Sequence, residues 1–247
     1  FYDPVILDSN NSGKGGQTAI KATKALIRIL GEQTSDGYVL RVDLRLRPDP
    51  GSNPIAVSLN SAQRYYENAG QNWERMAFIR ARSIAGDIEL GQKFLLSLQP
   101  FLWRKNLDFA AIQDIHSIKR QMSSRPIRNR NELNGHNIKL GKGGIREIEF
   151  FIQTQQLIWA GRDPKLRQEY LLKATNALME QNKISKQTAQ EIRAAYLFLR
   201  KIEHRLQMIN DQQTHQLPKS DQDIENIAIF SGFGNIESFK DSLLSVL

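Results

Sequence analysis

The sequence predicts an α+β protein that is predominantly helical, with a small mixed sheet near the N-terminus and a helical bundle after it. Two observations support this fold class. Residues 37–48 alternate without interruption between apolar and charged side chains, which is typical of a strand with one face on a core. From about residue 60 the apolar residues recur at helical spacing, most regularly from Ile192 to Ile209. The change of period therefore divides the chain into two structural classes.

The individual elements follow from local signals. Gly31 ends the first helix, Pro48 ends the strand, and Gly70 is expected to interrupt the helical run that begins near residue 60. The apolar run 55–59 is short enough to be a second strand that pairs with the first. A polar stretch rich in arginine and asparagine, 123–137, is predicted to be a mobile connection. Helices are expected at 18–30, from about 60 to 77 with the Gly70 break, at 87–98, around 112–122, from 145 onward, and at 192–209.

Composition limits the functional classes. The formal net charge of +8 and the pI near 9.7 suggest a polyanionic partner, which is nucleic acid, a nucleotide or phosphate, although a solvated basic surface explains the same charge. The chain has no cysteine, which excludes disulfides and thiolate metal sites. It contains no apolar run near the ~18 residues that a membrane span needs, and no signal peptide, so we expect a cytoplasmic protein. The opening at Phe1 without a methionine suggests a piece cut from a longer chain.

The charged face of the predicted strand is the first candidate site. It carries Asp43 beside Arg41, Arg45 and Arg47. One carboxylate among guanidinium groups is suited to holding a metal ion together with several phosphate oxygens. A strand whose outer face is merely salt-bridged explains the same pattern, and the sequence leaves both interpretations open.

The glycine-rich stretch 137–150 is the second candidate. Lys142 lies within its glycines, and Arg146 lies in the helix that follows. Backbone amides and the helix dipole at such a turn favour an anion. The pattern is not a Walker A loop, and a flexible entry into a helix explains the glycines equally well. Lys142 and Arg146 are therefore candidate phosphate ligands.

Other polar residues carry weaker signals. Glu74 and Arg75 lie within a helical pattern and form either an internal pair or part of a site. Glu203 falls off the apolar stripe of the last helix. No metal-ligand spacing links the histidines, which we interpret as structural. They are His116, His136, His204 and His215.

Several of these motifs together resemble the bifunctional glutamine synthetase adenylyltransferase/adenylyl-removing enzymes, and the resemblance covers essentially the whole chain. The later residues, with Glu-His-Arg-Leu-Gln at 203–207, resemble the N-terminal, adenylyl-removing half of that family. The motifs are Asp-Gly-Tyr-Val-Leu-Arg-Val-Asp-Leu-Arg-Leu-Arg-Pro at 36–48, Tyr-Tyr at 65–66, Gln-Asn-Trp-Glu-Arg at 71–75, Ile-Lys-Leu-Gly-Lys-Gly-Gly-Ile-Arg-Glu-Ile-Glu-Phe at 138–150, and Phe-Leu-Arg-Lys-Ile-Glu-His-Arg-Leu-Gln at 198–207.

The resemblance implies a polymerase-β-like nucleotidyltransferase domain at 1–105, lacking its first strand motif, and a helical domain at 106–247. The implied reaction removes AMP from an adenylylated tyrosine of glutamine synthetase with phosphate, giving ADP. Mg²⁺ is the implied cofactor, and Asp43 matches the third metal-binding aspartate. The first two aspartates of the family motif occur nowhere in the sequence, so we expect an incomplete site that is inactive alone.

The resemblance also implies partners: adenylylated glutamine synthetase, the PII signal protein, and phosphate, ADP or ATP. Neither nucleic acid nor membrane is expected. Arg45, Arg47, Lys142 and Arg146 are assigned to phosphate from charge and position alone. Two alternatives stay open. One is the adenylylating half, which uses ATP; the other is a non-catalytic helical module that binds nucleic acid or a protein partner.

Overall fold

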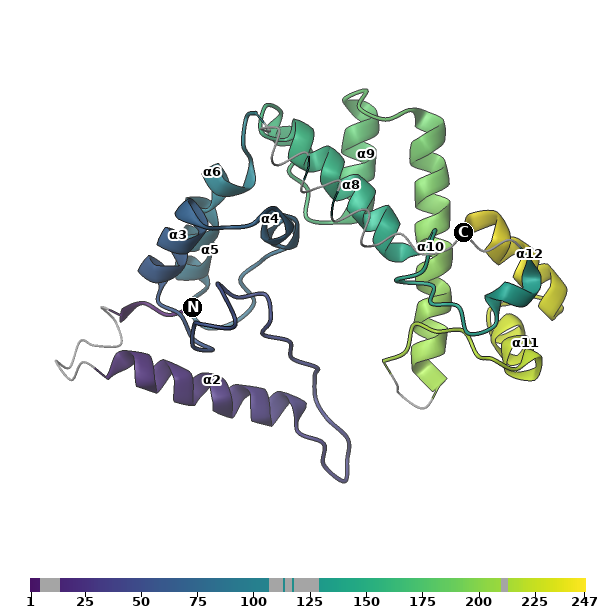
Figure 1. Ribbon diagram of the computed structural model, residues 1–247, viewed down its shortest axis with the longest axis horizontal. Helices are drawn as coiled ribbons and strands as arrows, with labels where there is room; N and C mark the ends of the chain where they lie inside the picture. Colours follow the sequence, from purple (N-terminus) through teal and green to yellow (C-terminus); the bar gives the residue numbers. More distant parts are fainter. Residues whose placement is uncertain (5–13, 107–112, 114–116, 118–128, 210–212) are drawn as a thin grey trace. The chain divides into compact units, whose positions relative to one another are not determined.

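The computed structural model describes residues 1–4, 14–106, 113, 117, 129–209 and 213–247 (Figure 1). The chain divides into two compact units, Phe1–Trp103 and Arg104–Leu247. Helices dominate both units, which confirms the predominantly helical prediction. The nucleotidyltransferase and helical roles given to domains 1–105 and 106–247 stay predictions. The helix predicted around 112–122 lies almost entirely outside the described residues, as do His116 and residues 123–128 of the polar stretch 123–137.

Unit 1 gathers short helices around an aromatic core. Ser58 and Asp87 cap α3 and α5 with their side-chain oxygens, as their positions before the apolar residues predict. Tyr66 lies at the centre of the core against Phe78 and Phe101. The helices are α2 (Gly15–Gly31), α3 (Leu59–Asn68), α4 (Asn72–Phe78), α5 (Ile88–Ser97) and α6 (Gln99–Leu102).

Gly70 separates α3 from α4, as predicted. A methyl group at this position would lie 2.5 Å from the ring of Phe101 and 2.9 Å from the carbonyl oxygen of Tyr66. The break in the helical run is therefore also a close contact with the core.

Glu74 and Arg75 are both buried and hold α4 in place. The Glu74 carboxylate accepts from the Gln71 amide and from the Tyr65 hydroxyl, at 2.8 and 3.1 Å. Burial raises the pKa of Glu74, while these two hydrogen bonds oppose that shift. The fully buried Arg75 guanidinium donates to the Leu102 carbonyl and to Asn72. These contacts are internal to unit 1, so both residues belong to its scaffold.

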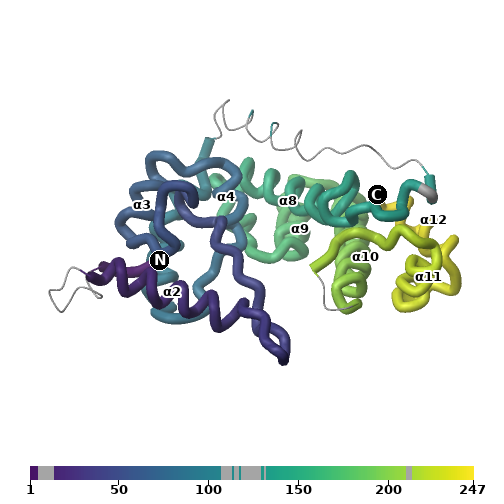
Figure 2. The backbone as a smooth tube through the Cα atoms, turned by 60° about the horizontal axis from the view of Figure 1, so that its bottom comes forward, coloured from purple at the N-terminus to yellow at the C-terminus, as the bar shows by residue number. Residues whose placement is uncertain are grey.

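The predicted sheet is not confirmed. Within the described residues the β-contacts are isolated bridges rather than ladders. The stretch 37–48 belongs to the connection from α2 to α3 and forms no ladder (Figure 2). The second predicted strand contacts a different partner: Tyr2 donates to Val57, and Leu59 donates to Tyr2. A period of two specifies the two faces of a strand, but a ladder also needs a neighbouring edge, and the described residues supply none for stretch 37–48.

Unit 2 is a helical bundle in which α8, α9 and α10 pack side by side (Figure 1). Ser185, Ser220 and Asn235 cap α10, α11 and α12 through their side-chain oxygens. The core includes Leu199, Ile202 and Leu206, which lie on the predicted stripe, with Ile145 and Phe239 from neighbouring helices. The helices are η1 (Arg130–Leu133), α8 (Ile145–Trp159), η2 (Pro164–Leu166), α9 (Leu171–Glu180), α10 (Lys186–Met208), α11 (Asp221–Phe230) and α12 (Ile236–Val246).

A buried side chain anchors the connection between α8 and α9. Gln156 of α8 is buried and donates to the carbonyls of Leu166 and Gln168, which fixes the connection from α8 to α9. None of the helices in the described ranges combines the length and the apolar character needed to cross a bilayer.

Candidate functional site

Asp43 lies in an extended, exposed stretch of unit 1. Its carboxylate makes a bidentate pair with Arg45, with the Arg45 Nη2 atom 2.6 Å from Oδ2 and Nε 3.0 Å from both oxygens. The Arg45 amide also donates to Oδ1 at 2.9 Å. The side chains of Asp43 and Arg45 are 55% and 87% exposed. The pair is therefore local and open to solvent.

The contact with Arg45 determines the charge state of Asp43. Hydrogen bonds from the Arg45 side chain and backbone lower the pKa of Asp43 to about 2. The carboxylate is consequently ionised at neutral pH, as an oxygen ligand for a cation must be. An incoming cation has to share or displace the Arg45 guanidinium, because Arg45 contacts both oxygens.

Arg47 is directed differently from Arg45. Its two terminal nitrogens donate to the carbonyls of Leu44 and Pro50, at 2.8 and 2.9 Å. These bonds hold the turn that ends the extended stretch. Arg47 is half-buried, and these two bonds fix the direction of its guanidinium toward the backbone of the turn.

The glycine-rich turn of unit 2 is fixed by contacts within the chain. The Asn137 side-chain oxygen accepts from the amides of Lys139 and Leu140. The first two amides of α8, those of Ile145 and Arg146, donate to the carbonyls of Ile138 and Lys139 at 3.0 Å. The helix N-terminus is thus capped by its own turn, and these two amides do not form the predicted anion cradle in this conformation.

Gly143 and Gly144 are required by that arrangement. Gly143 has a φ of +74°, a conformation that favours glycine. A methyl group on Gly144 would lie 2.6 to 2.9 Å from three backbone carbonyl oxygens. The side chains of Lys142 and Arg146 remain exposed at this turn. They belong to unit 2, whereas Asp43, Arg45 and Arg47 belong to unit 1, so the predicted site residues form two separate groups.

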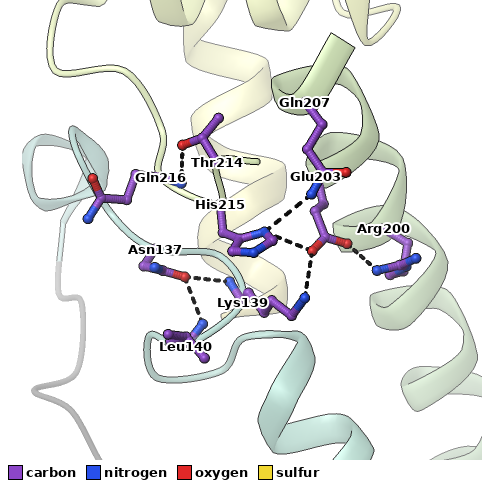
Figure 3. Close-up of polar contacts among 9 residues, drawn as sticks. All are labelled: Asn137, Lys139, Leu140, Arg200, Glu203, Gln207, Thr214, His215 and Gln216. Atoms are coloured by element: carbon purple, nitrogen blue, oxygen red, sulfur yellow. Dashed lines mark hydrogen bonds and ion pairs between the residues drawn. The ribbon is translucent and has the colours of Figure 1, made fainter. Parts of the chain in front are cut away.

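A second polar group in unit 2 centres on a buried carboxylate (Figure 3). Glu203 of α10 is only 1% exposed. Its Oε1 atom lies 2.9 Å from the Nδ1 atom of His215 and 3.4 Å from the Nζ atom of Lys139. Its Oε2 atom contacts the Arg200 guanidinium one helical turn earlier. We call Lys139, Arg200, Glu203 and His215 the Glu203 cluster.

The backbone holds the Glu203 cluster together. The segments around Ile138 and Leu217 run side by side: Ile138 donates to the His215 carbonyl at 2.9 Å, and Leu217 donates to the His136 carbonyl at 2.8 Å. The side chains of Ile138 and Leu217 are both buried. The cluster therefore joins the glycine turn, α10 and the segment before α11.

His215 lies between the Glu203 carboxylate and the Gln207 amide. Its Nδ1 atom is 2.9 Å from the Glu203 Oε1 atom, but this contact is not a hydrogen bond, because Oε1 has no hydrogen-bond partner in the described part of the chain. The Gln207 amide nitrogen donates to Nδ1 at 3.4 Å. Burial lowers the pKa of His215, and the charges of Lys139 and Arg200 lower it further, while Glu203 opposes them. These effects together favour the neutral ring.

Sequence reasoning alone does not find this cluster. The sequence shows Glu203 only as lying off the apolar stripe of its helix, and it predicts a structural role for His215. The available signal is a glutamate within the last turns of a helix whose neighbours Ile202 and Leu206 are core residues. Position on the helix alone does not tell whether such a side chain is covered by another segment.

The described residues contain no group of three or more histidine, aspartate or glutamate side chains able to hold a metal ion. Asp43 therefore belongs to no such group in this part of the chain. The described part of the chain therefore does not by itself fit a Mg²⁺ centre.

In the comparison with known proteins, a different family profile matches each half of the chain. Residues 2–97 match the family profile described as glutamate-ammonia ligase adenylyltransferase, and residues 116–246, more than half of the chain, match that described as GlnD PII-uridylyltransferase. The two matched ranges fall one in each compact unit.

Individual relatives match the sequence over all or nearly all of the chain. The bifunctional glutamine synthetase adenylyltransferase/adenylyl-removing enzyme of Rhizobium meliloti is 52% identical over 247 residues, which are all of this chain and 25% of that protein. Those of Mesorhizobium japonicum and Caulobacter vibrioides are 50% and 51% identical over 250 and 239 residues, covering 100% and 97% of this chain and about a quarter of each relative. The chain thus belongs to the family of bifunctional glutamine synthetase adenylyltransferase/adenylyl-removing enzymes and spans about a quarter of their length.

Proposed function

We propose that this chain is part of the adenylyl-removing half of such an enzyme, which transfers AMP from an adenylylated tyrosine of glutamine synthetase to phosphate and releases ADP. The observation that carries the proposal is the ionised, exposed Asp43 in the matched family range, flanked by Arg45 and Arg47. The proposal also includes PII signal protein as a partner and the cytoplasm as the location of the enzyme.

The exposed apolar side of the stretch 37–48 supports a nucleotidyltransferase sheet in this region. Leu40, Val42 and Leu46 are 60%, 37% and 61% exposed although they form the regular apolar side of the pattern. Such an alternating edge is suited to joining a sheet with a neighbouring strand. In that setting the Asp43 side would face the ligand.

The roles of the individual residues follow from charge and contact. Phosphorolysis needs negative charge neutralised on the transferring phosphoryl group and on the incoming phosphate. Arg45, once it exchanges one contact with Asp43, offers a guanidinium fork to a phosphate oxygen, and Arg47 lies two residues away. Lys142 and Arg146 are exposed cations of the second unit that are suited to the same class of ligand.

Mg²⁺ belongs to the proposal as the cofactor that Asp43 would help to hold. Because a lone carboxylate does not make a magnesium site, the other ligands would have to come from outside the described residues, and no step of the reaction is assigned to the ion.

The test is Asp43→Asn in a longer family enzyme that contains this segment. ADP release from adenylylated glutamine synthetase is expected to fall by at least about 100-fold, the scale of removing one group that stabilises charge in a transition state. Asp36→Asn is the matched control, because Asp36 is an exposed aspartate of the preceding turn. Unchanged deadenylylation by Asp43→Asn would remove Asp43 from the site. Pyrophosphate release instead of ADP would assign the segment to the adenylylating half.

A further inference from the structure

The Glu203 cluster holds more positive charge than its buried carboxylate needs. One carboxylate contacts the side chains of two permanent cations, Lys139 and Arg200, as well as the ring of His215. With His215 neutral, the four side chains together carry a charge of about +1. Neither Lys139 nor Arg200 has a second acidic partner among the described residues. A cluster that served only to neutralise Glu203 would need one cation.

His215 presents a second nitrogen that the cluster does not use. The Nδ1 atom accepts from the Gln207 amide nitrogen and lies 2.9 Å from the Glu203 carboxylate, whereas the opposite ring atom, Nε2, has no hydrogen bond within the described ranges. When Nδ1 accepts, the neutral ring carries its proton on Nε2. Nε2 is therefore a donor that no described side chain uses.

The cluster is reachable from solvent on its cationic side. The carboxylate is 1% exposed, whereas the side chains of His215, Lys139 and Arg200 are 17%, 25% and 34% exposed. The adjoining turn adds Lys142, an exposed cation without an ion pair in the described part of the chain. A ligand that approaches from solvent therefore meets nitrogen donors and positive charge first.

This chemistry selects a small anion. Two neighbouring cations repel a metal ion, and the cluster holds only one carboxylate and one imidazole as metal ligands. Oxygens of a phosphate-class anion match a lysine, an arginine and an imidazole, because each offers N–H donors or accepts a proton from the anion. We propose that Lys139, Arg200 and His215, positioned by Glu203, form a binding subsite for a phosphate-class oxyanion in unit 2.

The subsite differs from the predicted residues Asp43, Arg45 and Arg47 and does not depend on the reaction proposed above. All residues of the proposed subsite lie in unit 2. A phosphate ion and the phosphate of a nucleotide share the same chemistry, so both sources enter the test.

The test follows the four histidine rings of the nitrogen-15-labelled 247-residue chain by two-dimensional NMR, with His215 assigned from His215→Gln. A pH titration is recorded in chloride and again in inorganic phosphate at equal ionic strength. Phosphate bound beside Nε2 favours the protonated ring, so it is expected to raise the pKa of His215. The exposed His204 of the same helix as Glu203 is the internal control and keeps its chloride value. Parallel titrations with AMP and ADP tell a free phosphate from a nucleotide.

A matched pair of variants locates the effect. Arg200→Gln is expected to weaken phosphate binding by about tenfold, the effect of losing one charge-assisted hydrogen bond. Arg193→Gln removes an exposed arginine two turns earlier on α10 and is expected to leave binding unchanged. The proposal is overturned if phosphate shifts no histidine, shifts His204 as much as His215, or binds equally weakly to both variants. The titration of the parent chain needs no variant, so it tests the proposal even if Arg200→Gln misfolds.

Discussion

The Asp43 pair and the Glu203 cluster both place a carboxylate against an arginine, but they differ in what surrounds them. Asp43 is more than half exposed, and its partner Arg45 lies two residues away. Glu203 is buried, and its partners are Arg200 on its own helix, His215 twelve residues later and Lys139 from the distant glycine turn. Exposed ion pairs contribute little to stability, whereas removing one member of a buried pair is costly. The first arrangement leaves a carboxylate accessible to a ligand, and the second holds a fold together.

Removing the buried carboxylate is expected to produce the largest effect. Glu203→Ala leaves Lys139, Arg200 and His215 without their shared partner, and we expect the free energy of unfolding to fall by about 2–4 kcal/mol. Urea unfolding followed by circular dichroism measures the change. Glu191→Ala, at an exposed glutamate of the same helix, is the control and should change little. Equal effects of the two substitutions would show that burial of Glu203 does not set its importance.

The glycine turn that carries Lys139 is expected to be nearly as sensitive. Gly144→Ala forces a methyl group against three backbone oxygens, so we expect a loss of about 1–3 kcal/mol. Gly234→Ala is the control, because a methyl group there meets nothing within 4 Å. It is expected to be neutral or slightly stabilising. A Gly144→Ala protein as stable as the parent would mean that the turn relaxes without cost.

Acidification should weaken unit 2 before it reaches the Asp43 pair. The pKa of His215 is lowered in the folded protein, chiefly by burial, as is that of His136. As the pH falls below about 6.5, the unfolded chain therefore takes up protons first, and stability is lost until the pH reaches the lowered folded values. The Asp43 pair keeps its charge until the pH approaches about 2.

Thermal unfolding recorded as a function of pH measures this difference. His215→Gln is expected to reduce the loss of stability below pH ~6.5 without abolishing it, because His136 still contributes. A pH profile identical to that of the parent protein would exclude His215 as a source of the acid sensitivity.

The smallest effect on stability is expected for Asp43→Asn. The carboxylate pairs only with its close neighbour Arg45 and lies on the surface, so the midpoint of urea unfolding should not move. The same substitution is the one expected to lower ADP release by at least about 100-fold in a longer family enzyme. A clear loss of stability would instead make Asp43 a structural residue.

The two regions also show what the sequence could predict. Helices were predictable where caps and apolar spacing agree, as at Asp87 before α5 and along the stripe of α10. The pairing of the stretch 37–48 was not, because alternation specifies two faces of a strand but not its neighbour. Asp43 was predicted as a site residue from its motif, and that role stays a prediction. Glu203 was missed because its importance comes from residues 64 positions earlier and 12 positions later, at Lys139 and His215.

Arg75 places a permanent charge in the core of unit 1. Its guanidinium is fully buried in unit 1 and donates to the Leu102 carbonyl. An arginine does not lose its proton in a protein, so its charge is the same at every pH at which the unit is folded. The neighbouring Glu74 is also buried, and its carboxyl group can take up a proton, so the total charge of this core still depends on pH. Acidity therefore changes the interior charge of unit 1 through Glu74 and the charge around Glu203 in unit 2 through His215, while Arg75 stays a constant positive charge.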